Sequence, residues 1–298
     1  MLQKTILFAF IALFSFTAKA QTDTSKFQET IKLPVDTLAY QKPQKFGFIT
    51  HAPNDLWKIS KAPFQKDNLK GLGWVVGSTA LLYWQDQNLV NGAQQFSRHI
   101  GLDDATNFYV PLKIAGQRMV KIPQNLNTAF YEMGEGGTTM YIAAGLFIYG
   151  KLNKDNRSLQ TASDLTESFI SMGVATQILK RITGRQTPSY ATKERGEWNF
   201  FPANHDFNSS KPSYDSFPSG HLSTMMATVT VLAQNYPEKK WIKPVGYSII
   251  GLTGFSMLNN GSHWASDYPL AIALGYLSGK IITNRHQQKH EHTQNFML

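Results

Sequence analysis

Two histidines in the sequence stand in settings that could support acid–base or nucleophilic chemistry. His221 follows Pro-Ser-Gly at 218–220 and opens a run of residues compatible with a helix. Free backbone N–H groups at a helix start, with a glycine that allows close approach, form a site for an anion such as phosphate. His263 lies four residues before Asp267. On a helix this spacing allows a His–carboxylate hydrogen bond, which fixes the imidazole tautomer and leaves the other ring nitrogen free to attack.

Each of these settings also has a simpler explanation. A histidine can merely cap a helix, and a His–Asp pair at this spacing is often a surface ion pair. Lys180 and Arg185 lie at the end of another helical segment, where Gly184 is a plausible stop. These cations could bind an anion, or they could complement the negative end of the helix dipole. The three segments together indicate a phosphate-type site more strongly than any one of them.

Taken in order, the three segments resemble the signature of the superfamily of type 2 phosphatidic acid phosphatases and vanadium haloperoxidases. That signature is Lys, six residues and Arg-Pro; then Pro-Ser-Gly-His; then Ser-Arg, five residues, His, three residues and Asp. The matching positions here are Lys180, Pro188, Pro218, Ser219, Gly220, His221, Ser256, His263 and Asp267. The resemblance covers about residues 130–285.

The sequence departs from this signature at two positions. Thr187 and Met257 stand where the family has arginines that clasp phosphate oxygens. Each such charge-assisted contact contributes on the order of 1.5–3 kcal/mol, so the substitutions put phosphate affinity and turnover in doubt. Arg185 could replace one of the arginines, whereas nothing obvious replaces the one at Met257. A non-catalytic member of the family therefore stays open as an alternative.

The resemblance implies an all-α fold, a bundle of about six core helices, with both histidines at one end. It implies that His263 attacks phosphorus, that Asp267 orients His263, and that His221 protonates the leaving oxygen. The residues expected to bind the substrate phosphate are Lys180, Arg185, Ser219 and Gly220. No metal and no cofactor are required.

These implications predict a metal-independent phosphatase that works through a phosphohistidine intermediate. The substrate would be a lipid phosphate, an isoprenoid pyrophosphate or a small phosphomonoester. A non-catalytic phosphate-recognising or structural protein is the first alternative. A vanadium-dependent haloperoxidase is less favoured, because a permanently held vanadate needs more cationic ligands than this sequence offers.

The elements that must position these residues are predicted to be helices. Apolar helical segments are expected at 70–85, 87–100, 137–151, 157–182, 220–236, 244–258 and 266–284. Strict two-residue alternation is absent, which argues against a core built on a sheet. The apolar runs are shorter than the ~18 residues that indicate a membrane-spanning helix. This favours a buried bundle, although the many small residues would also suit helices packed in a membrane.

The two ends of the chain differ from its middle. Residues 1–20 combine Lys4, an apolar run and Ala-Lys-Ala, which predicts a cleaved signal peptide and export to the periplasm, either free or on a membrane facing it. Residues 21–65 are polar and rich in proline, and we expect an extended N-terminal arm. Residues 66–285 form the predicted helical phosphatase domain, and residues 286–298 form a polar tail.

Composition narrows the possible partners. The formal net charge of +9 suits an anionic substrate or an anionic membrane surface. No compact basic run interleaved with aromatic residues is present, so nucleic acid is not expected as a partner. The absence of cysteine excludes disulfides and thiolate metal sites. The one predicted partner is the phosphorylated substrate, for which a lipid is one candidate. Membrane association stays open, and the oligomeric state is not predicted.

Overall fold

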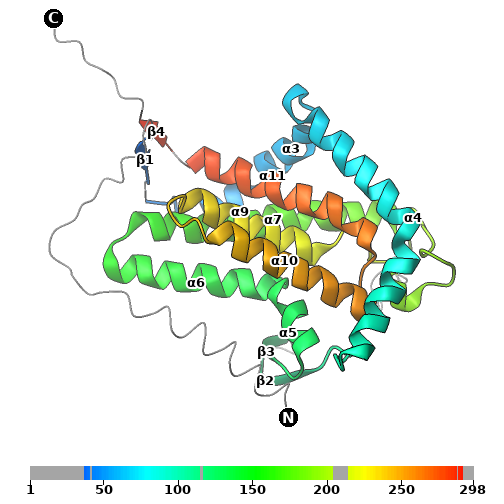
Figure 1. The fold of residues 1–298 in the computed structure, drawn as a ribbon. Coiled ribbons are helices and arrows are strands. Elements are labelled where there is room, and N and C mark those ends of the chain that lie inside the picture. Colours follow the sequence, from blue (N-terminus) through cyan, green and yellow to red (C-terminus); the bar gives the residue numbers. More distant parts are fainter. Residues whose placement is uncertain (1–36, 41, 115–116, 204–213, 287, 291–298) are drawn as a thin grey trace, which may run out of the picture.

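Long helices form almost all of the regular structure in the computed structural model (Figure 1), which describes residues 37–40, 42–114, 117–203, 214–286 and 288–290. The longer helices are α4 (Leu69–His99), α6 (Gly136–Asn153), α7 (Asn156–Thr183), α9 (Gly220–Asn235), α10 (Ile242–Asn259) and α11 (Tyr268–His286). The shorter ones are α2 (Gly47–Thr50), α3 (Ala52–Lys61) and α5 (Leu126–Met133). The predicted all-α class, with about six core helices, is confirmed.

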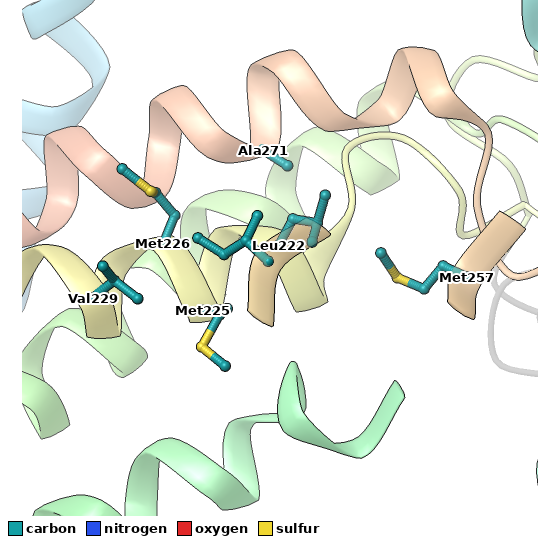
Figure 2. Close-up of a cluster of buried hydrophobic side chains, with 7 residues drawn as sticks. Leu222, Met225, Met226, Val229, Met257 and Ala271 are labelled. Carbon is teal, nitrogen blue, oxygen red and sulfur yellow. The ribbon is translucent and has the colours of Figure 1, made fainter. Parts of the chain in front are cut away.

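Helix α9 lies at the centre of the bundle. It packs against α11, α7, α10 and α6, and α4 contacts α10 and α11 (Figure 1). The hydrophobic core follows from this arrangement, because the buried side chains of α9 meet those of its neighbours. Leu222 and Met226 on α9 belong to one buried cluster with Met257 of α10 and Ala271 of α11 (Figure 2).

Local sequence signals explain where the helices that carry the site begin and end. Gly184 has a φ of 49° and closes α7 in the left-handed conformation, as its place in the sequence predicts. Ser219 caps α9, since its side chain accepts a hydrogen bond from the Leu222 N–H. The last turn of α7 and the first turn of α9 are therefore both fixed by their own residues.

The strands are short and lie at the edges of the bundle. Strands β2 (Phe108–Ile114) and β3 (Gln117–Pro123) form an antiparallel hairpin next to α5. Strand β1 (Thr37–Ala39) pairs antiparallel with β4 (Gln288–His290), near the two ends of the described chain. Neither pair supplies the core, so the expectation against a sheet-based core holds for the described residues.

The expected N-terminal arm differs from the structure in its second half. Residues 47–61 form α2 and α3 rather than extended chain, and α3 packs on α7 and α11. The physical reason is a buried ion pair: Asp55 on α3 is fully buried and pairs with Arg285 on α11. The predicted signal peptide and the first part of the arm lie outside the described residues. So does most of the predicted polar tail, residues 286–298.

Helix α4 is one continuous helix, although the sequence suggested a break between 70–85 and 87–100. Asp86 lies inside it and is fully buried. Among the helices of the described residues, none combines the length and the apolar character needed to cross a membrane.

Candidate active site

The His263–Asp267 pair forms as expected, although not on a helix. His263 lies in the loop after α10, and Asp267 ends a 3₁₀ turn at Ala265–Asp267. The Nδ1 atom of His263 is 3.3 Å from the Oδ2 atom of Asp267, and both side chains are buried. This contact favours the tautomer that carries its proton on Nδ1, which leaves Nε2 with its lone pair for attack.

Asp267 receives several hydrogen bonds besides that of His263. Its Oδ2 atom accepts from the Trp264 N–H at 2.9 Å and from the Ser216 hydroxyl at 2.6 Å. Its Oδ1 atom accepts from Arg185 at 2.6 Å. Burial alone would raise the pKa of Asp267, but the Arg185 guanidinium and these hydrogen bonds outweigh it and hold that pKa below its usual value. Asp267 is therefore a fixed carboxylate behind the imidazole.

His221 faces this pair from the first turn of α9. The centroids of the His221 and His263 rings are 6.2 Å apart, and the Tyr131 ring lies 4.2 Å from that of His221. The Nε2 atom of His221 is buried and has no hydrogen-bond partner among the described residues. The pKa of His221 lies well below its usual value, chiefly because the ring is buried. Electrostatic repulsion from His263 and Lys180 lowers it further. A bound phosphate dianion would oppose these effects and favour the protonated imidazole that a general acid needs.

Lys180 brings a positive charge from the last turn of α7 to the start of α9. Its ammonium contacts the backbone oxygen of Asp215 at 2.9 Å and the carboxylate of Asp215 at 2.8 Å. A Cβ placed on Gly220 would lie 3.9 Å from the Lys180 nitrogen, so the two are neighbours. The Ser219 N–H donates to the backbone oxygen of Asp267 at 3.2 Å, which ties the second motif segment to the third.

The three motif segments thus converge, and they bring Lys180, His221 and His263 close together. The sequence of residues 161–291 matches the family model described as PAP2 superfamily. Residues 161–291 are a PAP2 superfamily domain. It contains Lys180, His221, His263 and Asp267, the expected site residues.

Individual relatives match shorter or more distant parts of the chain. A lipid A 1-phosphatase of Porphyromonas gingivalis is 37% identical over 68 residues, which are 22% of this chain and 15% of that protein. The crystal structure of Aquifex aeolicus LpxE matches with a TM-score of 0.41 and 22% identity, over 53% of this chain and 83% of that one. A transmembrane PAP2 type phosphatidylglycerolphosphate phosphatase from Bacillus subtilis matches with a TM-score of 0.42 and 17% identity, over 81% and 96%.

Arg185 does not lie where the sequence interpretation placed it in the PAP2 domain. It is fully buried, and its guanidinium donates to Asp267, to Asp86, to the Ser266 hydroxyl and to the Arg195 backbone oxygen. These bonds use all five of its N–H groups, so none is left for a phosphate oxygen. The geometry therefore does not support Arg185 as a substrate ligand, and it joins Arg185 to the carboxylate behind His263 instead.

Thr187 and Met257, which stand where the family has arginines, are both buried. Met257 is fully buried, and its sulfur lies 3.6 Å from the hydroxyl of Ser219, the residue that caps α9. The side chain of Thr187 is almost buried, and its hydroxyl has no hydrogen-bond partner among the described residues. Neither side chain supplies a charge to the PAP2 site.

Sequence inspection missed several residues beside the site. Lys121 on β3 contributes to the depressed pKa of His221 and is itself held by Glu135. Tyr131 packs on His221, and Asp86 reaches the site through Arg185. All of these precede the PAP2 domain, so the family signature does not contain them. A clue was present for Asp86, since a lone charge inside an apolar helical run implies a buried partner.

Proposed function

We propose that this protein is a phosphatase that hydrolyses the phosphate ester of a lipid through a phosphohistidine intermediate, without a metal. The observation that carries the proposal is the pair of histidines, His221 and His263, whose ring centroids lie 6.2 Å apart. His263 also contacts the buried carboxylate of Asp267. A phosphoryl group between them meets a nucleophile on one side and a proton donor on the other. Lys180 and the backbone N–H groups at the start of α9 would carry the charge of its other oxygens.

The reaction has two steps. The Nε2 atom of His263 attacks phosphorus, the bond from phosphorus to the ester oxygen breaks, and His221 gives that oxygen a proton. Water then attacks phosphorus while His221 takes a proton from that water, the bond from phosphorus to the Nε2 atom of His263 breaks, and inorganic phosphate leaves. Asp267 stabilises the positive charge that develops on His263 in the first step.

Three observations support a lipid as the carrier of the phosphate. The outer faces of the helices expose large apolar side chains, among them Trp74 and Trp84 on α4 and Phe147, Ile148 and Leu152 on α6. An apolar groove of about 570 Å³ follows the outside of α7 as far as Arg181, the neighbour of Lys180. The matching P. gingivalis protein is a lipid A 1-phosphatase. Exposed apolar surface of this kind is typical of membrane contact.

We further propose export by the segment 1–20 and action on the periplasmic side of a membrane. Cell fractionation followed by a carbonate wash tests the membrane contact, and sequencing of the mature N-terminus tests cleavage before Gln21. A protein recovered from the soluble fraction with Met1 intact would contradict both parts.

Hydrolysis of a lipid phosphate and of an aryl phosphate, each with and without a chelator, tests the activity. We expect release of phosphate that the chelator does not reduce, inhibition by vanadate, and an acid-labile phosphoenzyme that His263→Ala does not form. A protein that binds vanadate without hydrolysing any ester would be a non-catalytic family member. Vanadate-dependent oxidation of bromide would instead indicate a haloperoxidase.

A further inference from the structure

A buried carboxylate outside the PAP2 domain takes part in the hydrogen-bond network of the site. Asp86 lies in the middle of α4 and is fully buried. Its Oδ1 atom accepts from the Ser266 N–H at 2.9 Å. Its Oδ2 atom accepts from Arg185 at 2.6 Å and from the Ser266 hydroxyl at 2.5 Å. Asp86 thus fixes both the residue next to Asp267 and the arginine that binds Asp267.

The Arg185 guanidinium is shared between two carboxylates. One amino group donates to Asp267 at 2.6 Å and the other donates to Asp86 at 2.6 Å, and all three side chains have no exposed surface. Aromatic rings surround the guanidinium: those of Tyr83 and Trp198 lie at 5.0 Å and that of Trp264 at 5.3 Å. This surrounding fixes the fork of the guanidinium in one plane, and with it the position of the Asp267 carboxylate.

Charge balance gives Asp86 a second effect on the site. Arg185 and Asp267 alone would form a neutral pair, and the guanidinium would weaken the pull of Asp267 on the His263 proton. With Asp86 present, one positive and two negative charges leave a net negative charge behind His263. In a buried site such a charge acts strongly, because little solvent screens it.

We propose that Asp86 is a positioning residue for the nucleophile: through Arg185 and Ser266 it holds Asp267 against His263 and offsets the charge of Arg185. This inference rests on the proposed function, in which His263 is the nucleophile. It adds to the PAP2 site a residue from α4, a helix that lies wholly before residues 161–291.

The experiment compares Asp86→Asn with Asp55→Asn in the full chain. Asp55 is a close match, since it is also a fully buried aspartate paired with an arginine, Arg285, which has a second acid in Glu167. In each variant the arginine keeps one acidic side chain as a hydrogen-bond partner, so we expect both proteins to fold. Asp86→Asn should lower kcat about tenfold or more, with KM changed less than about twofold, because the loss falls on the transition state. Asp55→Asn should leave both constants near those of the wild type.

A pH profile separates positioning of the site from general damage to the fold. His263 must be unprotonated to attack, and a negative charge behind it stabilises the protonated form. Asp86→Asn should therefore move the protonation of the His263 ring, followed directly by nitrogen NMR, to lower pH, whereas Asp55→Asn should not. The other groups facing His263 are unchanged between the variants: Asp267 on its own segment, His221 on α9, and Lys180 and Lys121, which act on His221.

Two further measurements keep the inference open to refutation. If Asp86→Asn does not fold, Ser266→Ala takes its place. This variant removes the bridging hydroxyl without changing charge, so kcat should fall several-fold while the protonation of the His263 ring stays at the same pH. If the wild type hydrolyses no phosphate, the proposed function fails, and nitrogen NMR of the His263 ring then decides. A folded Asp86→Asn with wild-type kcat and pH profile, a wild-type kcat in Ser266→Ala, or an unchanged His263 spectrum through its titration would each overturn the inference.

Discussion

Replacing Arg185 distinguishes the role that the sequence suggested from the one that the structure indicates. Arg185→Met keeps the apolar stem and removes the charge. Asp86 and Asp267 would then remain buried, close together and without their shared cation. Removing one partner of a buried ion pair costs about 3–5 kcal/mol. For a chain of this size each kcal/mol lowers the melting temperature by about 2–4 °C, so the melting temperature should fall by roughly 6–20 °C.

The assay measures thermal unfolding and vanadate inhibition on the same preparations of wild type, Arg185→Met and Arg185→Lys. Lysine keeps the charge but lacks the planar fork, so Arg185→Lys should lose less stability while still losing kcat. Vanadate affinity should change little relative to the loss of kcat, since the guanidinium has no free N–H for an oxyanion. The reasoning would be refuted by Arg185→Met with a wild-type melting temperature and a vanadate affinity reduced tenfold. That result would make Arg185 the phosphate ligand first expected.

The remaining predictions concern the histidines, the missing arginines and a buried glutamate. His263→Ala should abolish hydrolysis of every ester, whereas His221→Ala should spare esters with very good leaving groups, as rates across a leaving-group series would show. Thr187→Arg, at a position that keeps some exposed surface, should tighten vanadate inhibition about tenfold, whereas Met257→Arg, at a fully buried position, should lower the melting temperature without that gain, because an unpaired charge would be buried. Burial and a hydrogen bond to Asp55 outweigh the opposing effect of Arg285 and raise the pKa of Glu167 to about 8, so the folded state keeps a proton that the unfolded state loses. The free energy of unfolding should therefore fall as the pH rises from about 5 to 8, and Glu167→Gln, measured by urea unfolding, should flatten that dependence.

A helix was predictable from sequence where an apolar segment is bounded at both ends by polar residues or by glycine. The expected segment 157–182 and the observed α7, Asn156–Thr183, nearly coincide, because Asp155 and Gly184 cap the helix with local residues. The convergence of Lys180, His221 and His263 was predictable only through the family signature, since no local pattern brings three distant segments together. The structure supports that convergence through the contacts among the segments.

Buried charges account for most of what sequence inspection missed. Asp86 looked like a break in a helix because its partner, Arg185, lies 99 positions away. Asp55 looked like part of a solvated arm because its partner, Arg285, lies 230 positions away. A pattern read over a few turns cannot show such partners, so it assigns a lone charge to solvent or to a helix end. For the same reason the sequence analysis assigned Arg185 to the substrate phosphate, whereas in the structure it pairs with Asp86 and Asp267.

The contact between Asp86 and Ser266 joins residues that are 180 positions apart in the chain. Closing so long a loop costs entropy that is recovered only when the helices between them have packed, so we expect this contact to form late in folding. A chain cut before Asp267 would lack both α11 and the carboxylate that lies behind His263. Catalytic activity should therefore return only with the slowest phase of refolding, after most of the helical circular dichroism signal has already recovered.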